Sequence, residues 1–246
     1  MIEQQQNPTL PIHGVIGCLS SIKNKYQIKS IDTEQCKEWL LYKHYAKRIP
    51  AIIYSFGLYT NDLILQGICT FGTPARMLNM GYGVFNGEIQ ILTCELNRLV
   101  VNENLEKNTL SFFVAGCLKM LPKPICIVSY ADGNNGHHGY IYQATNWIYT
   151  GITSSEKIYI NTRTNEVLHP RTVVSMFGSR EVDKLPDYIQ ISKEESGKYR
   201  YFQFLGNKRD VLKMKKHLKY EILPYPKGEN KRYDASYKPS IQTTLF

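Results

Sequence analysis

Residues 125–147 of the chain read ICIVSYADGNNGHHGYIYQATNW, and this stretch decides the fold. Its first seven residues, 125–131, are largely apolar, which is typical of a strand buried on both faces of a parallel-type sheet. The polar, glycine-rich residues 132–139 predict a loop, and residues 140–147 predict a short helix. A strand that passes through a loop into a helix is a building unit of α/β domains.

The helix expected just before this strand is the clearest in the chain. Its apolar residues recur at the spacing i, i+3, i+4, i+7, i+8 and i+11, which places them on one helical face. They are Leu110, Phe113, Val114, Cys117, Leu118 and Leu121. Pro122 ends the helix because proline cannot continue it.

Further elements extend this pattern in both directions. The residue patterns predict strands at 24–31, 49–60, 62–71, 88–101 and 156–161, and a helix at 33–49 that begins with a capping box. The order of strand, helix, three strands, helix, strand, helix and strand predicts a mixed α/β domain with strand–helix–strand crossovers.

These elements divide the chain into three parts. Residues 1–22 are polar and contain prolines, which predicts an irregular N-terminal segment. Residues 23–165 hold the α/β domain. Residues 166–246 contain several prolines and predict a second region of helices and strands.

The composition excludes several classes of protein. Of the 246 residues, 43% are hydrophobic and 21% are charged, which suffices for a sizeable core and excludes a disordered chain. No run of about 18 uncharged apolar residues exists, so a membrane span is excluded. The first residues lack the basic-then-apolar order of a secretory signal, and we expect a cytoplasmic protein.

The six cysteines are scattered along the chain without a Cys-x-x-Cys pair. This spacing suits neither a disulfide framework nor a zinc knuckle. Because an unpaired cysteine behaves as a small hydrophobic residue, we expect reduced and buried thiols.

The positive charge is concentrated at the C-terminal end. The chain has 30 Lys and Arg against 21 Asp and Glu, and residues 198–246 alone hold twelve against four. Aromatic residues are interleaved with these cations, which favours a nucleic-acid surface, although a basic tail can also be a solvated face. The expected DNA contacts are Arg98, Lys208, Arg209, Lys213, Lys215, Lys216, Lys231 and Arg232.

Candidate catalytic residues follow the strand at 125–131. In open sheets ligands gather at the carboxyl ends of central strands, where Asp132, His137 and His138 lie in this chain. Aspartate and histidine can serve as base, acid or metal ligand. The alternative is a turn in which Asp132 caps backbone amides and glycines supply positive φ. Two neighbouring histidines do not define a metal site.

A second candidate pair is His44 and Tyr45, near the end of the helix expected at 33–49. A histidine at a helix C-terminus can also serve only to balance the helix dipole. Both interpretations stay open at the level of the sequence.

Four segments together resemble a known family. They are KHYAKRIP at 43–50, ELNRLVV at 95–101, SYADGNNGHHGYIYQATNW at 129–147 and NEVLHP at 165–170. On these residues the chain resembles GNAT-type acyltransferases, and more closely the phage Mom proteins, which modify adenine in phage DNA. The resemblance covers roughly residues 30–170. It implies a GNAT-like mixed sheet flanked by helices, to which the composition of residues 166–246 adds an expected basic C-terminal extension of helix and strand.

The resemblance also implies roles for single residues. Tyr142 matches the tyrosine that protonates a departing coenzyme A thiolate, and His44, Tyr45 and Asp132 match functional positions of the Mom family. Acetyl-CoA or a related acyl-CoA is the implied cofactor, held by Leu99, Val100, Val101, Asn108, Thr109, Ser111 and Asn146. The chain departs from GNAT proteins at 100–113, where the usual glycine-rich pyrophosphate loop has no glycine.

The implied reaction adds a carbamoylmethyl-type group to adenine N6 in DNA, which protects the DNA from host restriction enzymes. The N6 lone pair is delocalised, so a base is needed, with Asp132 or His44 as candidates. The adenine would be flipped out of a duplex or bound in single-stranded form. A metal such as iron remains open, with no ligand spacing that supports it.

Two other classes of function compete with this one. An ordinary N-acyltransferase for small molecules or proteins would be favoured by a glycine-rich phosphate loop. A non-catalytic DNA-binding protein would need no set of Asp, His and Tyr at the strand ends.

Overall fold

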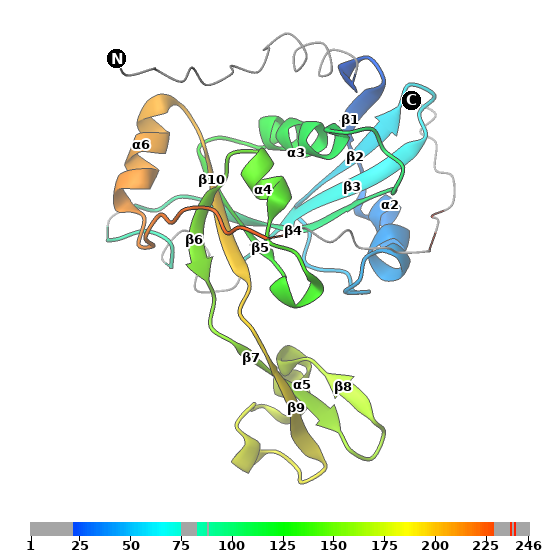
Figure 1. Ribbon diagram of the computed structural model, residues 1–246, viewed down its shortest axis with the longest axis vertical. Helices are drawn as coiled ribbons and strands as arrows, with labels where there is room; N and C mark the ends of the chain where they lie inside the picture. Colours follow the sequence, from blue (N-terminus) through cyan, green and yellow to red (C-terminus); the bar gives the residue numbers. More distant parts are fainter. Residues whose placement is uncertain (1–21, 75–82, 88, 229–236, 238, 240–246) are drawn as a thin grey trace, which may run out of the picture. The chain divides into compact units, whose positions relative to one another are not determined.

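The computed structural model describes residues 22–74, 83–87, 89–228, 237 and 239 (Figure 1). Seven strands form one sheet in the order β1-β2-β3-β4-β5-β10-β6, and three more form a second sheet in the order β8-β7-β9. The strand pair β4 and β5 is parallel, whereas the pairs β1–β2, β2–β3, β5–β10 and β10–β6 are antiparallel. The expected mixed sheet flanked by helices is confirmed.

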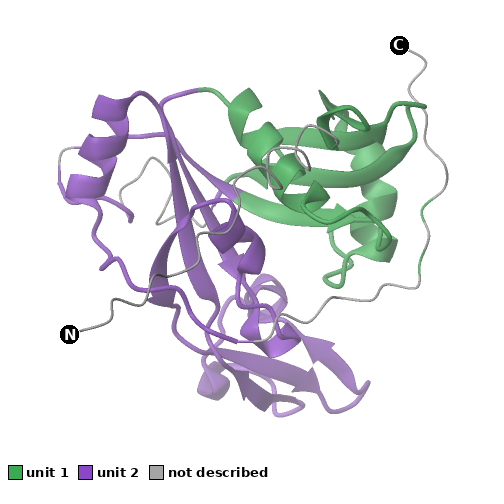
Figure 2. Cartoon of the chain, turned by 45° about the horizontal axis from the view of Figure 1, so that its top comes forward, with its two compact units in different colours: residues 1–73, 96–122, 234–246 green, residues 74–95, 123–233 purple. Residues whose placement is uncertain are grey.

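The chain divides into two compact units (Figure 2). Unit 1 comprises residues 1–73, 96–122 and 234–246, and unit 2 comprises residues 74–95 and 123–233. The expected N-terminal segment 1–22 lies almost wholly outside the described residues.

Unit 1 contains an antiparallel meander and two helical segments. Its elements are β1 (Tyr26–Ser30), α2 (Thr33–Glu38), the π-helix η1 (Trp39–Lys43), β2 (Tyr54–Thr60), β3 (Leu65–Gly72), most of β4 (Thr93–Val101) and α3 (Thr109–Met120). The core forms where α2 and η1 bury Cys36, Trp39 and Leu40 against the strands. The β2–β3 hairpin confirms the two strands expected around Asn61.

The helix expected at 33–49 is shorter than its pattern suggested. It begins as expected at the capping box of Asp32 and Gln35, but changes to π geometry at Trp39 and ends after Lys43. The backbone amide of His44 donates to the Trp39 carbonyl at 2.8 Å, five residues back, and His44 itself has an extended backbone. The helix therefore stops before His44 rather than at Pro50.

Unit 2 is built around β5 (Ile125–Ala131). All but one residue of β5 are buried, which confirms the strand predicted from the apolar run. Apart from the small inserted sheet described below, its other elements are the 3-10 helix η3 (Gly133–Asn135), α4 (Tyr140–Ala144), β6 (Ile148–Ile152), β10 (Tyr199–Leu205) and α6 (Lys208–His217).

The partner of β5 on its second edge comes from far along the chain. Strand β10 pairs with β5 from Tyr199 opposite Ala131 to Leu205 opposite Ile125, and pairs with β6 on its other edge. The seven-stranded sheet therefore does not end at the boundary expected after residue 165. A strand of the region 166–246 completes it.

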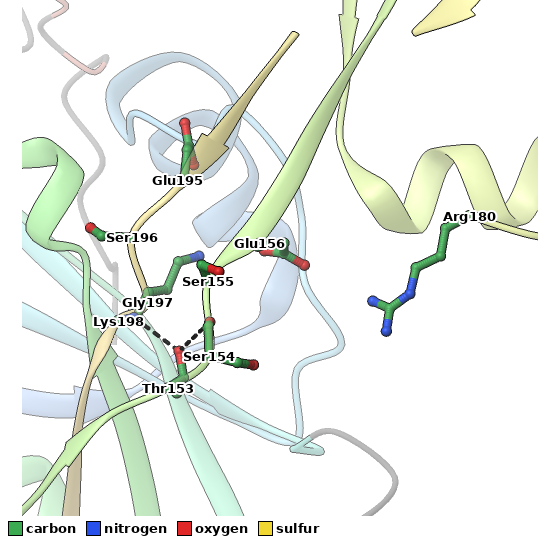
Figure 3. A pocket seen from close by; sticks show the side chains of 9 residues that line it. All are labelled: Thr153, Ser154, Ser155, Glu156, Arg180, Glu195, Ser196, Gly197 and Lys198. Carbon is green, nitrogen blue, oxygen red and sulfur yellow. Dashed lines mark hydrogen bonds between the residues drawn. The ribbon is translucent and has the colours of Figure 1, made fainter. Parts of the chain in front are cut away.

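A small sheet is inserted between β6 and β10. It consists of β7 (Glu156–Asn161), β8 (Glu166–Leu168) and β9 (Ile189–Glu195), with α5 (Pro170–Phe177) and the 3-10 helix η4 (Val182–Lys184). Its own core contains Tyr159, Leu168, Val173, Leu185 and Ile189. A pocket of about 230 Å³ lies where its two connecting segments meet, lined by residues 153–156, Arg180 and residues 195–198 (Figure 3).

The cysteines and helices agree with two expectations from composition. Cys36, Cys69, Cys94, Cys117 and Cys126 are buried and unpaired, whereas Cys18 lies outside the described residues. None of the helices in the described part is long and apolar enough to cross a membrane.

The apolar stripe on α3 gives a test of this core. Phe113 is fully buried, so Phe113→Ala should lower the free energy of unfolding by roughly 3–5 kcal/mol in denaturant melts. Met120→Ala is the matched control because Met120 is 47% exposed on the same helix. A loss below about 1 kcal/mol for Phe113→Ala would contradict the packing of α3.

Candidate active site

Asp132 directly follows β5 and fixes the loop after it. Its Oδ1 accepts hydrogen bonds from the Asn134 backbone amide at 3.1 Å and the Asn134 side chain at 3.3 Å, and its Oδ2 accepts one from the Asn135 side chain at 3.1 Å. Gly136 and Gly139 have φ of 73° and 81°. The capping turn that competed with a catalytic interpretation is therefore present.

This turn does not use the whole carboxylate. Asp132 is 7% exposed, and an ionised carboxylate has about four acceptor positions. The described residues place three hydrogen bonds on it, two on Oδ1 and one on Oδ2. One acceptor position on Oδ2 is therefore unused among the described residues.

His137 and His138 have different surroundings. Burial lowers the pKa of His137, and the nearby Asp132 opposes this shift. The His138 ring lies 5.3 Å from the Tyr199 ring, and its backbone carbonyl accepts a hydrogen bond of 2.5 Å from the Tyr201 hydroxyl. No group of three or more His, Cys, Asp or Glu side chains that could hold a metal occurs within the described ranges.

Tyr142 projects from α4 toward β5. Its side chain is buried, and its hydroxyl oxygen accepts a hydrogen bond of 2.7 Å from the Ser129 hydroxyl. Its ring centroid lies 5.0 Å from that of Trp147 and 5.1 Å from that of Tyr201. Asn146, two residues after α4, is exposed and has a positive φ of 59°. The phenol of Tyr142 thus contacts Ser129 near the carboxyl end of β5. Ser129 lies three residues before Asp132 in the sequence.

His44 and Tyr45 belong to unit 1, where they follow η1. The Nδ1 atom of His44 accepts a hydrogen bond of 3.0 Å from the Ala46 backbone amide. The neutral imidazole therefore carries its proton on Nε2. The Tyr45 ring stacks on the His44 ring with a centroid distance of 4.4 Å. Asp132 and Tyr142 belong to unit 2.

Six of the seven residues expected to hold a cofactor fall into two groups in unit 1, whereas Asn146 belongs to unit 2. The first is the end of β4, which pairs in parallel with β5 only from Thr93 to Glu95. Val100 is buried in the core of unit 1, so it can contact a ligand only through its backbone, whereas Leu99 and Val101 are half-buried.

The second group surrounds the start of α3. Asn108 has a φ of 70°, and its side chain does not cap the helix. The Ser111 hydroxyl donates to the Asn108 carbonyl at 2.9 Å, and the Thr109 hydroxyl is buried without a hydrogen-bond partner in the described structure. Glycine normally supplies such a positive φ, but asparagine adopts it more readily than most residues. Asn108 therefore has a positive φ although the segment 100–113 contains no glycine.

The expected DNA contacts concentrate on α6. This helix buries Met214 and exposes a set of cations along its length. They are Lys208, Arg209, Lys213, Lys215 and Lys216. Arg98 is half-buried on β4 and donates to the Asn97 carbonyl at 2.6 Å. Lys231 and Arg232 lie outside the described residues.

One notable residue was missed by the sequence analysis. Lys43 is 1% exposed, and its Nζ lies 2.5 Å from a carboxylate oxygen of Glu103. A signal for it exists in the sequence, because Lys43 occupies the i+7 position of the apolar stripe that contains Cys36 and Leu40. A cation at such a position indicates a buried charge that needs a partner.

Comparisons with known proteins identify a family and a distant relative. A family model described as the Mom protein family matches residues 25–227. The methylcarbamoylase mom of Escherichia phage Mu is 28% identical over 220 residues, which cover 82% of this chain and 86% of that protein.

Several solved acetyltransferases also align with the chain. A GNAT-family acetyltransferase from Bacillus cereus has a TM-score of 0.36 and 11% identity, over 73% of this chain and 96% of that one. Arabidopsis thaliana NAA60 has a TM-score of 0.44 and 9% identity, over 74% and 99%. The spermidine/spermine N-acetyltransferase SpeG from Vibrio cholerae has a TM-score of 0.39 and 9% identity, over 74% and 94%.

The surroundings of His137 predict a pH effect on stability. Because burial lowers its pKa in the folded state, the unfolded state binds this proton more tightly. The contribution of His137 to stability is therefore present above the unfolded pKa of about 6.5 and is lost as the pH falls below it. In urea melts, the free energy of unfolding should fall less between pH 7.5 and pH 5.5 for His137→Gln than for the unchanged protein. Equal losses would contradict the prediction.

Proposed function

Because the chain belongs to the Mom protein family, we propose that it is a transferase that modifies adenine in DNA. The observation that carries this proposal is the match to the phage Mu methylcarbamoylase over most of both chains. The proposed product carries a carbamoylmethyl-type group on adenine N6 and resists host restriction enzymes. The site residues described above support this chemistry as follows.

Asp132 is the proposed base. Adenine N6 is a poor nucleophile because its lone pair is delocalised into the ring, so removal of an N6 proton must accompany attack. The capping hydrogen bonds hold the Asp132 carboxylate in one orientation, and its Oδ2 keeps a position for that proton. The turn and the catalytic role are therefore compatible.

His44 suits a different task. Its Nδ1 already accepts the Ala46 amide, so its neutral ring presents Nε2 as a hydrogen-bond donor. A donor can bind a carbonyl oxygen on which negative charge develops. We therefore assign base chemistry to Asp132 rather than to His44.

Tyr142 is the proposed proton donor to the leaving group. The Ser129 hydroxyl donates to the Tyr142 oxygen, and this hydrogen bond would stabilise the phenolate that remains after proton transfer. The neighbouring Trp147 and Tyr201 rings hold the phenol in place.

An acyl-CoA is the proposed donor, and the start of α3 offers a fit for its phosphates. The first amides of a helix have no partner within it and favour an anion, and the Asn108 side chain leaves them uncapped. Bound there, an acyl-CoA would supply an acyl group on a thioester, and attack of N6 on it would form an N-acyl bond and release the coenzyme A thiolate. A carbamoylmethyl group is joined through its CH2 carbon, so that product requires a donor whose leaving group is on the CH2 carbon. The backbone of Leu99 and Val101 is the proposed contact for the amide groups of coenzyme A.

The chemistry is tested by nucleoside mass spectrometry of DNA from cells that express the chain. Asp132→Asn keeps the size of the side chain and should lower the yield of modified adenine by about 10²–10⁴-fold, the range for a general base. Asp183→Asn is the control because Asp183 is exposed in the inserted sheet region. Unmodified DNA in cells with the unchanged chain would refute the proposed function.

DNA binding is tested by the salt dependence of affinity. The triple variant Lys213→Gln, Lys215→Gln and Lys216→Gln should reduce the slope of log affinity against log salt by up to about 2.7, because each lost phosphate contact removes about 0.9. The matched control neutralises three exposed lysines of the inserted sheet region, which are Lys157, Lys184 and Lys193. Equal slopes for the two triple variants would show that α6 does not contact DNA.

A further inference from the structure

Lys43 is a charged side chain within the apolar face of a helix. It lies at the end of η1, beyond the buried Trp39 and Leu40, and is 1% exposed. Removing an ammonium group from water costs free energy that only close partners offset. The partners of Lys43 therefore matter more than those of a surface lysine.

Two residues from distant parts of the sequence provide these partners. The Nζ of Lys43 donates to a Glu103 carboxylate oxygen at 2.5 Å and to the backbone carbonyl of Tyr237 at 3.1 Å. Glu103 lies in the segment between β4 and α3, and its side chain is 40% exposed. All three residues belong to unit 1.

Tyr237 contacts the same helical segment at two further points. Its hydroxyl is hydrogen-bonded to the Glu38 carboxylate, and its ring centroid lies 5.4 Å from that of Tyr42. The bond to Glu38 raises the pKa of Tyr237 to about 12, so the phenol remains protonated and donates at neutral pH. Residue 237 thus contacts Glu38, Tyr42 and Lys43 together.

Stability alone does not explain this arrangement. An apolar side chain of similar size in place of a buried ion pair is often neutral or stabilising. An apolar side chain would lose the directional hydrogen bonds from Nζ to Glu103 and Tyr237, which are among the contacts that fix the end of η1. The residue that follows Lys43 is His44.

The orientation of His44 depends on the same turn. Its backbone amide bonds to the Trp39 carbonyl at 2.8 Å, and its ring accepts the Ala46 amide at 3.0 Å. The peptide between Lys43 and His44 is planar, so an inward Lys43 also restricts the backbone from which the imidazole extends.

We propose that Lys43 is a positioning residue for the His44 imidazole, held in place by Glu103 and by Tyr237. The consequence for catalysis rests on the function proposed above, whereas the orientation of His44 does not. Tyr237 then has a role in unit 1 that is separate from DNA binding.

The orientation is measured by ¹⁵N-edited NMR of the imidazoles at neutral pH, with the His44 signal assigned by its loss in His44→Gln. In the unchanged protein His44 should show the tautomer with Nε2 protonated. In Lys43→Met this ring should lose the Ala46 bond and show averaged tautomers. A His44 signal identical to that of the unchanged protein would overturn the proposal.

Two further variants separate positioning from general damage. Lys37→Met is the control because Lys37 is exposed and forms an ion pair with Glu34 on the same helix, at 2.6 Å. Its His44 signal should not change. If Lys43→Met does not fold, Glu103→Gln changes the contact between Lys43 and Glu103 from its other side. The Glu103 side chain is 40% exposed, so this replacement disturbs the core less. Folding is confirmed by a melting temperature within about 4 °C of the unchanged protein.

Kinetics connect the orientation to the reaction. Lys43→Met should lower kcat for DNA modification by up to about 10²-fold, the loss typical of a small misplacement, while KM for DNA stays unchanged. A raised KM with an unchanged kcat would contradict positioning. If the unchanged chain does not modify DNA, the proposed function fails, and the His44 spectra still decide the role of Lys43.

Discussion

The backbone of β5 is hydrogen-bonded to β4 on one edge and to β10 on the other, and six of its seven residues are buried. Buried backbone groups need such partners because water cannot reach them. This requirement brings residues 199–205 from the C-terminal part of the chain into the sheet. The loop that carries Asp132 then starts from the end of β5, where Ala131 is paired with Tyr199 of β10 and the pairing with β4 has already ended at Val128.

The sequence predicted the elements whose signal is local. The apolar run at 125–131 and the stripe on α3 are both periodic patterns that burial imposes on neighbouring residues. It did not predict the place of β10, because the segment YRYFQFL at 199–205 was interpreted from its aromatic and basic residues as part of a nucleic-acid surface. Strand pairing over that distance leaves no local signal. The change to π geometry at Trp39 was also missed.

For the site, the sequence located candidate groups but did not distinguish their tasks. It allowed either Asp132 or His44 as the base. The contacts of each side chain separate the two, because Asp132 can still accept a proton, whereas the Nδ1 of His44 is occupied by the Ala46 amide. The hydrogen bond from the Ala46 amide forms only in the folded turn, so the spacing of residues in the sequence does not reveal it. The catalytic roles themselves stay predictions.

The basic composition of the C-terminal region suggested one role, which is contact with DNA. The structure shows that this region also supplies residues of the core. Its cations face solvent on α6, yet Met214 of the same helix packs into the core that includes Phe202 of β10. Tyr237 binds a buried lysine in unit 1. Removal of everything after residue 197 would therefore delete a central strand as well as the positive charge, and any loss of DNA binding would be ambiguous. Neutralising the exposed lysines leaves β10 and Met214 in place, so it isolates the electrostatic contribution from the structural one.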